Sequence, residues 1–121
     1  MRLRSLMGCL ALICFLSACG GVFTVPVEVK TSKGQILRGT AVATAQAGTF
    51  EVANGEGLTC SGTYDPQSLE RTLEVALNCS DGRHGKANIQ RDSTLANGIG
   101  QGKFSDGTEF EVEFGDYAGP T

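Results

Sequence analysis

Four short turns that end in glycine divide the chain at nearly regular intervals. They are Ser32-Lys33-Gly34, Ala53-Asn54-Gly55, Ser80-Asp81-Gly82 and Ser105-Asp106-Gly107. Their glycines are 21, 27 and 25 residues apart, the length of one hairpin plus its return strand. Asn-Gly is a strong hairpin signal, because both central residues of the tight turn need positive φ. The spacing predicts an up-and-down meander with these turns at one end.

Between the turns, apolar and polar residues alternate with the period of two that is typical of half-buried strands. The expected strands cover residues 22–30, 36–45, 49–53, 58–64, 86–91, 99–104 and 109–115. Pro26 favours an edge or first strand, because proline has no backbone N–H to donate to a neighbouring strand. The same inward face is expected after each of the last three turns, formed by Leu58, Cys60, Gly62; Gly85, Ala87, Ile89; and Phe110, Val112, Phe114.

Residues 66–77 fit two patterns. Asp65 can cap a helix with Pro66 at its first position, and leucines recur behind them at helical spacing. The alternation from Leu73 to Cys79 fits a strand equally, and we favour the strand. The predicted fold is therefore all-β: one small antiparallel meander of about eight strands over residues 23–115, as a closed barrel or a strongly twisted sheet, with a short frayed tail at 116–121.

The N-terminal residues 1–18 have the layout of a secretory signal peptide. Arg2 and Arg4 precede an uncharged apolar run of 11 residues at 6–16, and Ser17-Ala18 supplies small residues behind it. A spanning helix needs about 18 apolar residues or more, so this run is too short to remain in a membrane. No later run approaches that length, and we expect no transmembrane segment in the mature chain.

Leu16-Ser17-Ala18-Cys19 resembles the lipobox of bacterial lipoproteins. The resemblance implies cleavage before Cys19 and lipidation of its thiol and new N-terminus with acyl chains such as palmitate. Residues 19–22 then form a lipidated tether, and the bilayer is the first partner. Because Gly20 is not aspartate, the family's sorting rule favours the outer membrane, facing the periplasm. The alternative is ordinary secretion, with cleavage after Gly20.

The five cysteines divide according to this interpretation. Cys9 and Cys14 leave with the signal, Cys19 carries lipid, and Cys60 and Cys79 remain in an oxidising compartment, where disulfides persist. We expect a Cys60–Cys79 bridge, which the chain-entropy relation values at roughly 3 kcal/mol. Two free thiols or a two-ligand metal site are the alternatives, although a zinc site would have too few ligands.

The net charge and the polar side chains indicate neither a catalytic site nor a metal site. Without the signal, 8 basic residues stand against 13 acidic ones, and the net charge of −5 argues against nucleic acid as a partner. His84 has no predicted nucleophile beside it. Glu109, Glu111 and Glu113 form an acidic row that fits a solvated outer face better than a cation site. Asp81 and Asp106 lack the dense oxygen ligands of a calcium loop. We expect no enzyme, metal or cofactor.

Two further resemblances concern the β region. Residues 98–115, with Gly98-x-Gly100 before Asp106-Gly107, are similar to one hairpin of a MORN-type repeat. The wider pattern, which includes 62–66, 79–83 and Arg91-Asp92, looks like small uncharacterised envelope lipoproteins of alphaproteobacteria, and this implies no activity. The expected function is a non-enzymatic binding or structural module on the envelope, with an unknown protein partner. The alternative function is inhibition of lysozyme-type enzymes. The chain resembles the periplasmic inhibitors of these enzymes in its size, its acidity and its expected disulfide bridge.

Overall fold

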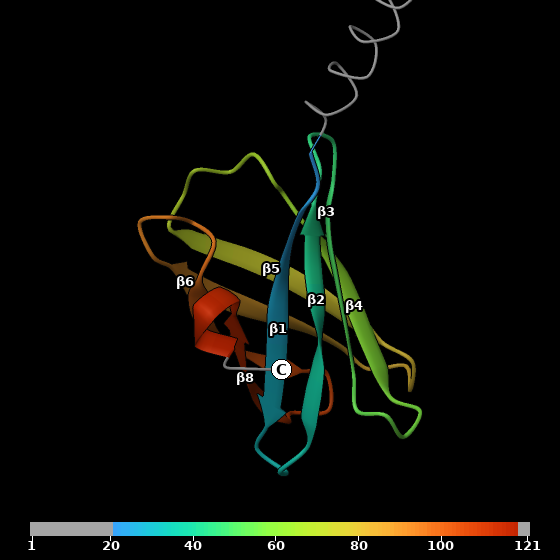
Figure 1. Cartoon of the computed structure of the whole chain (residues 1–121). Helices are drawn as coiled ribbons and strands as arrows, with labels where there is room; N and C mark the ends of the chain where they lie inside the picture. The colour runs from blue at the N-terminus through green and yellow to red at the C-terminus, as the bar shows by residue number, and fades with distance from the viewer. Residues whose placement is uncertain (1–20, 119–121) are drawn as a thin grey trace, which may run out of the picture.

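The computed structural model describes residues 21–118 of the chain (Figure 1). The predicted signal segment, the predicted lipobox with Cys19 and the last three residues lie outside the described residues. Within residues 21–118, no helix is long and apolar enough to cross a membrane.

Eight antiparallel strands form a closed barrel, which confirms the predicted fold class and selects closure over an open sheet. Each strand pairs with the next one, and β8 pairs back onto β1, so that Val29 lies opposite Val112. The strands are β1 (Phe23–Thr31), β2 (Ile36–Ala43), β3 (Gly48–Ala53), β4 (Thr59–Tyr64), β5 (Thr72–Cys79), β6 (His84–Arg91), β7 (Gly98–Phe104) and β8 (Glu109–Phe114), followed by the 3-10 turn η1 (Gly115–Ala118).

Residues 66–77, which fitted either a helix or a strand, form a loop followed by a strand. β5 begins at Thr72, and residues 65–71 form the loop before it, so the helical alternative is wrong. Asp65 accepts a hydrogen bond from the backbone N–H of Gln67 at 2.9 Å, which closes an Asx turn instead of starting a helix. Leu69, which helical periodicity would bury, is 82% exposed.

Pro26 lies in β1, the first strand, which is one of the two positions predicted for it; the other position, an edge, does not exist in a closed barrel. Pro26 pairs with Thr40 of β2, and the β1–β8 ladder starts one residue later at Val27. Two boundary predictions need correction. β6 begins at His84, two residues before the predicted start of this strand at residue 86. The predicted frayed tail is wrong at residues 116–118, since η1 packs on the barrel and buries Ala118.

The two ends of the barrel differ. The four glycine turns all lie at one end, the lower one in Figure 1, as their spacing predicted. We call this the closed end. The opposite end carries the connections 44–47, 65–71 and 92–97 together with the start of β1, and we call it the open end.

Large side chains fill the half of the barrel near the closed end. The rings of Phe104 and Phe110 pack at 4.4 Å between centroids, and Leu37 of the same core cluster is fully buried. A disulfide joins Cys60 of β4 to Cys79 of β5, which lie directly opposite each other with Cα atoms 4.0 Å apart. Every strand pairing and the whole core lie within residues 23–118, so this segment contains the contacts of an independently folding unit.

Inward-facing glycines make room for aromatic rings on the neighbouring strand. A Cβ built on Gly62 would lie 2.6 Å from Cζ of Phe50, and one on Gly48 would lie 2.7 Å from the ring of Tyr64. Both distances are shorter than a real Cβ contact. The glycines are therefore required by close packing, which is the usual meaning of glycine inside a strand.

Candidate ligand-binding site

A cavity of about 390 Å³ occupies the half of the barrel near the open end. Its volume falls within the roughly 300–1,000 Å³ that is usual for small-molecule sites. Its wall is mostly apolar and comes from seven of the eight strands and two of the open-end loops. The apolar residues of the wall include Val25, Val27, Ala41, Ala43, Phe50, Leu73, Val75, Ile89, Val112 and Phe114.

Small residues on the inward face explain why this half is hollow. Ala41 and Ala43 face inward from β2, and Gly98 and Gly100 face inward from β7. In small barrels the interior is filled only as far as the inward side chains reach. The inward-facing residues are therefore large near the closed end, where they fill the barrel, and small near the open end, where they leave a cavity.

Hydrogen bonds fasten the loops around the mouth of the cavity. The side-chain amide of Gln67 donates to the carbonyl of Ala45 at 2.8 Å and joins two of the open-end connections. Asn97 accepts from the backbone N–H of Asp116 at 2.7 Å, which ties the third connection to η1. Leu95 in that connection has φ of 63°, an uncommon value for leucine, and it lines the cavity.

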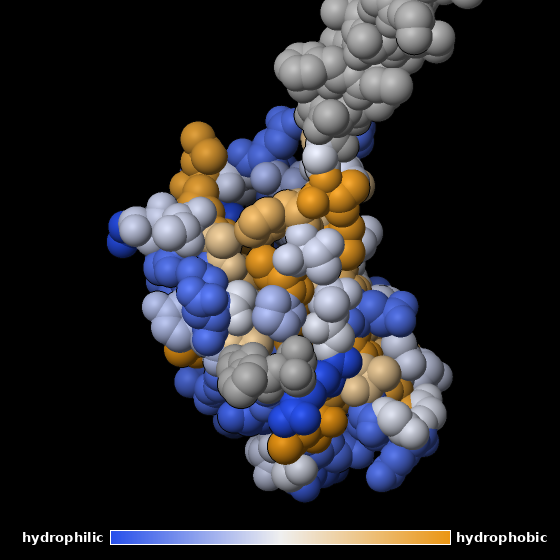
Figure 2. Space-filling model, in the orientation of Figure 1, coloured by the Kyte–Doolittle hydropathy of each residue, from blue (hydrophilic) through white to orange (hydrophobic). Residues whose placement is uncertain are grey.

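Exposed apolar residues surround the mouth. Phe23 (54% exposed) and Leu69 line its outer part, and Val22 (64% exposed) precedes Phe23. Figure 2 shows hydrophobic residues gathered around a hollow on this face, close to the point where the described chain begins. The mouth is thus adjacent to the segment predicted to be the tether, only a few residues after Cys19.

Two polar side chains interrupt the apolar wall. Arg91, at the end of β6, is 9% exposed and donates through Nη2 to the carbonyls of Ser68 (3.1 Å) and Glu70. Tyr64, at the end of β4, also lines the cavity. Burial raises the pKa of the Tyr64 hydroxyl above its ordinary value, although the positive charge of Arg91 opposes this rise. At neutral pH, Tyr64 is therefore an uncharged hydroxyl.

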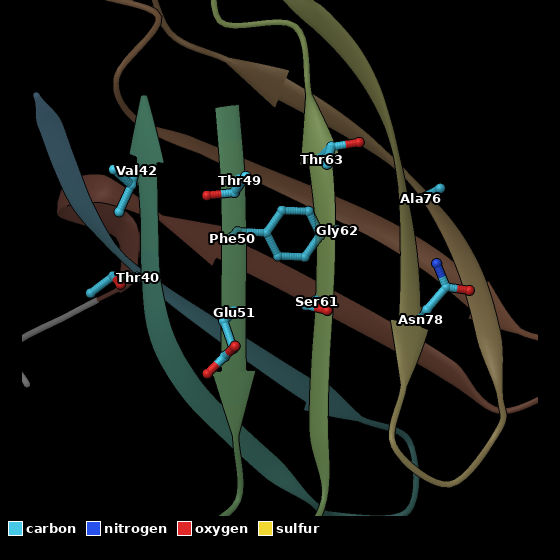
Figure 3. Close-up of a pocket in the computed structure, with 10 residues that line it drawn as sticks. All are labelled: Thr40, Val42, Thr49, Phe50, Glu51, Ser61, Gly62, Thr63, Ala76 and Asn78. Carbon is cyan, nitrogen blue, oxygen red and sulfur yellow. The ribbon is translucent and has the colours of Figure 1, made fainter. Parts of the chain in front are cut away.

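A second hollow, of about 480 Å³, lies on the outer surface of β2 to β5 (Figure 3). Short polar side chains dominate it, among them Thr40, Thr49, Ser61 and Thr63. No side-chain polar atom in this hollow is both buried and unpaired. Glu51 is the one charged residue that lines it.

The polar residues that were considered as candidate sites and set aside in the sequence lie away from the cavity. His84 is exposed, near the closed end. Glu109, Glu111 and Glu113 follow the outer face of β8, and Lys30 lies 3.7 Å from Glu113. Among residues 21–118, no group of three or more His, Cys, Asp or Glu side chains is arranged to hold a metal ion.

Asp81 and Asp106 come together around Arg83 at the closed end, which the sequence did not reveal. Arg83 reaches Asp81 at 2.9 Å and Asp106 at 3.3 Å, and its guanidinium lies 4.7 Å from the centroid of the Phe104 ring. The backbone N–H of Arg83 donates to Asp81 and lowers the pKa of that carboxyl. The N–H of Thr108 does the same for the pKa of Asp106. This cluster stabilises two turns.

Sequence reasoning missed Arg91 as a cavity residue, although a signal was present. On the expected strand 86–91, Ala87 and Ile89 were assigned to the inward face, and the same alternation assigns Arg91 to it. A charged side chain at the inward end of a strand is unusual, because charged groups are rarely buried without a partner.

The fold and the cavity define a class: a small, closed, eight-stranded β-barrel with an apolar cavity open at one end. No family model and no curated protein sequence matches the chain. Two solved structures are similar to it. One is described as a de novo designed fluorescence-activating β-barrel, at 22% identity and a TM-score of 0.57, over 75% of this chain and 88% of that one. The other is described as a redesigned β-barrel, mFAP1, bound to DFHBI. It has 17% sequence identity and a TM-score of 0.58, and the match covers 76% of this chain and 91% of that one. At these identities the likeness concerns the fold alone.

Proposed function

We propose that the chain is a lipoprotein of the bacterial cell envelope that is anchored through acylated Cys19 and binds small apolar molecules in its barrel, without catalysing a reaction. The anchor rests on the lipobox resemblance, which also favours the periplasmic face of the outer membrane. The observation that carries the binding role is the apolar cavity at the open end. One of the two similar barrels holds a small molecule, DFHBI, which shows that a barrel of this fold can take one.

The energetics support binding without further machinery. Burial of apolar surface contributes about 25 cal/mol per Å², or about 0.8 kcal/mol for each buried CH₂. A chain of eight buried carbons therefore contributes roughly 6 kcal/mol before the costs of association. The mouth opens beside the predicted tether, so a molecule that partitions into the membrane would be concentrated near the entrance.

The binding role is tested with N-phenyl-1-naphthylamine, a neutral apolar probe whose fluorescence rises in apolar surroundings. The segment 20–121 should bind it saturably at one site. Ala41→Leu places three more carbons into the cavity and should weaken binding at least tenfold with little loss of stability. Val42→Leu adds one carbon at the next position, on the outer face, and is the matched control. Equal binding by Ala41→Leu and the control would show that the probe does not use the cavity.

The anchor has a separate test. Intact-mass analysis of the membrane fraction should show diacylglycerylated Cys19, and Cys19→Ala should release the protein from membranes. A Cys19→Ala protein that remains with the membranes would contradict the anchor. The inhibitor alternative remains a prediction from size, charge and disulfide, and titration of a lysozyme with segment 20–121 checks it.

A further inference from the structure

The cavity contains a buried positive charge that has no counter-charge among residues 21–118. Arg91 extends inward from the end of β6 and lines the cavity while 9% exposed. Two of its interactions are known: Nη2 donates to the carbonyl oxygens of Ser68 and Glu70. Both acceptors are neutral backbone groups, so they orient the guanidinium but do not neutralise it.

The same guanidinium has an unused donor. Nε of Arg91 is buried and forms no hydrogen bond within residues 21–118. A buried donor without an acceptor is costly, and it is more costly on a charged group. Unpaired groups of this kind are rare in folded proteins and call for an explanation.

No described side chain supplies the missing anion. No carboxylate within residues 21–118 lies within ion-pair distance of Arg91. Asp92, the next residue, is engaged by Thr94 and Asn97 in its own loop. Tyr64 is uncharged at neutral pH, because burial raises its pKa. The cavity therefore combines an apolar wall with one positively charged donor near its mouth.

We propose that the ligand of this cavity is a single-chain amphiphile with a carboxylate head, which pairs with Arg91 while the hydrocarbon chain extends along the apolar wall. This inference rests on the proposed function, since it names the ligand class of the same site. Because Nη2 already donates to two loop carbonyls, Nε is the buried donor left for the ligand. Nε can donate one charge-assisted hydrogen bond to a carboxylate oxygen. The volume of about 390 Å³ is near the lower limit for small-molecule sites, which favours one chain over two.

The test compares three ten-carbon competitors that differ only in the head group: decanoate, decan-1-ol and decylammonium. Each displaces N-phenyl-1-naphthylamine from segment 20–121 at pH 7.4, and calorimetric titration of decanoate provides a probe-free measurement. Decanoate should displace the probe at a concentration at least about tenfold lower than decanol, as expected for a hydrogen bond to a charged group. Decylammonium should be the weakest.

Arg91→Gln should abolish the difference between decanoate and decanol while the probe still binds. Arg91→Lys, which retains the charge, should keep a preference for decanoate even if Arg91→Gln does not fold. Arg71→Gln is the matched control, since it removes an exposed charge at the same end of the barrel and should leave the preference unchanged.

The outcomes separate the two proposals. If the wild-type protein binds the probe and the three competitors displace it equally well, the carboxylate inference is overturned and the apolar cavity remains as a binding site. An equal loss of the preference in Arg71→Gln would show that net charge, not Arg91, selects the head group, and would also overturn it. Absence of binding for both probe and decanoate would overturn the proposed function together with this inference.

Discussion

Removal of the disulfide should destabilise the barrel by a predictable amount. Cys60 and Cys79 are separated by 19 positions, and the chain-entropy relation gives about 3 kcal/mol for a loop of that size. Both sulfurs are buried among core side chains, so the substitution Cys60→Ala/Cys79→Ala adds a packing loss. Reduction of the wild type breaks the same bond but leaves both sulfurs in the core.

Urea unfolding of segment 20–121 measures both effects. With a urea dependence of about 1–3 kcal/mol per molar for a small protein, a loss of about 3 kcal/mol lowers the midpoint by roughly 1–3 M. The double alanine variant should fall below the reduced wild type by the contribution of sulfur packing. Binding of N-phenyl-1-naphthylamine well below the midpoint should be unchanged, because neither cysteine lines the cavity.

The refuting result is a midpoint that moves by less than about 0.3 M in the reduced wild type, which corresponds to less than about 1 kcal/mol. It would mean that residual pairing between the β4 and β5 segments already restricts this part of the chain in the unfolded ensemble. A reducing agent that shifts the double alanine variant as well would show that the shift has another source.

Two further predictions concern packing and pH. Gly62→Ala should lower the free energy of unfolding by about 1–3 kcal/mol, because its Cβ would overlap the backbone carbonyl of Ala76 and the ring of Phe50, which points at Gly62 in Figure 3. Chemical denaturation measures this loss, and a neutral effect would contradict the close packing. The pKa values of Asp81 and Asp106 are lowered in the folded barrel, so the unfolded chain binds more protons in acid. Their stabilisation is complete above the unfolded pKa of about 3.9 and is lost as the pH falls through the folded values. Asp81→Asn/Asp106→Asn should flatten this acid decline in denaturation curves from pH 7 to pH 2, and an unchanged decline would assign it to other groups.

Predictions from the sequence were most accurate where the determining physics is local. The inward parity of Cys60, Ala87 and Val112 followed from alternation alone, and all three are buried. The Cys60–Cys79 bridge was expected from the cysteine count, and the structure places the two residues directly opposite each other on β4 and β5. Residues 66–77 fitted two patterns because helical spacing and a strand preceded by an Asx turn look similar over a short segment, and the strand that we favoured is β5.

The sequence by itself determined the strands, their inward faces and the end at which the glycine turns lie, because alternation and turn chemistry act between near neighbours. Closure was decided only by the tertiary structure, since the β1–β8 ladder joins the first and last strands of the barrel, and no local pattern encodes that pairing. The tertiary structure also determines the cavity, because the cavity volume depends on the inward side chains of many strands together. For the same reason the role of Arg91 was hidden: its inward direction was readable from the sequence, but the absence of a counter-charge depends on every element around it.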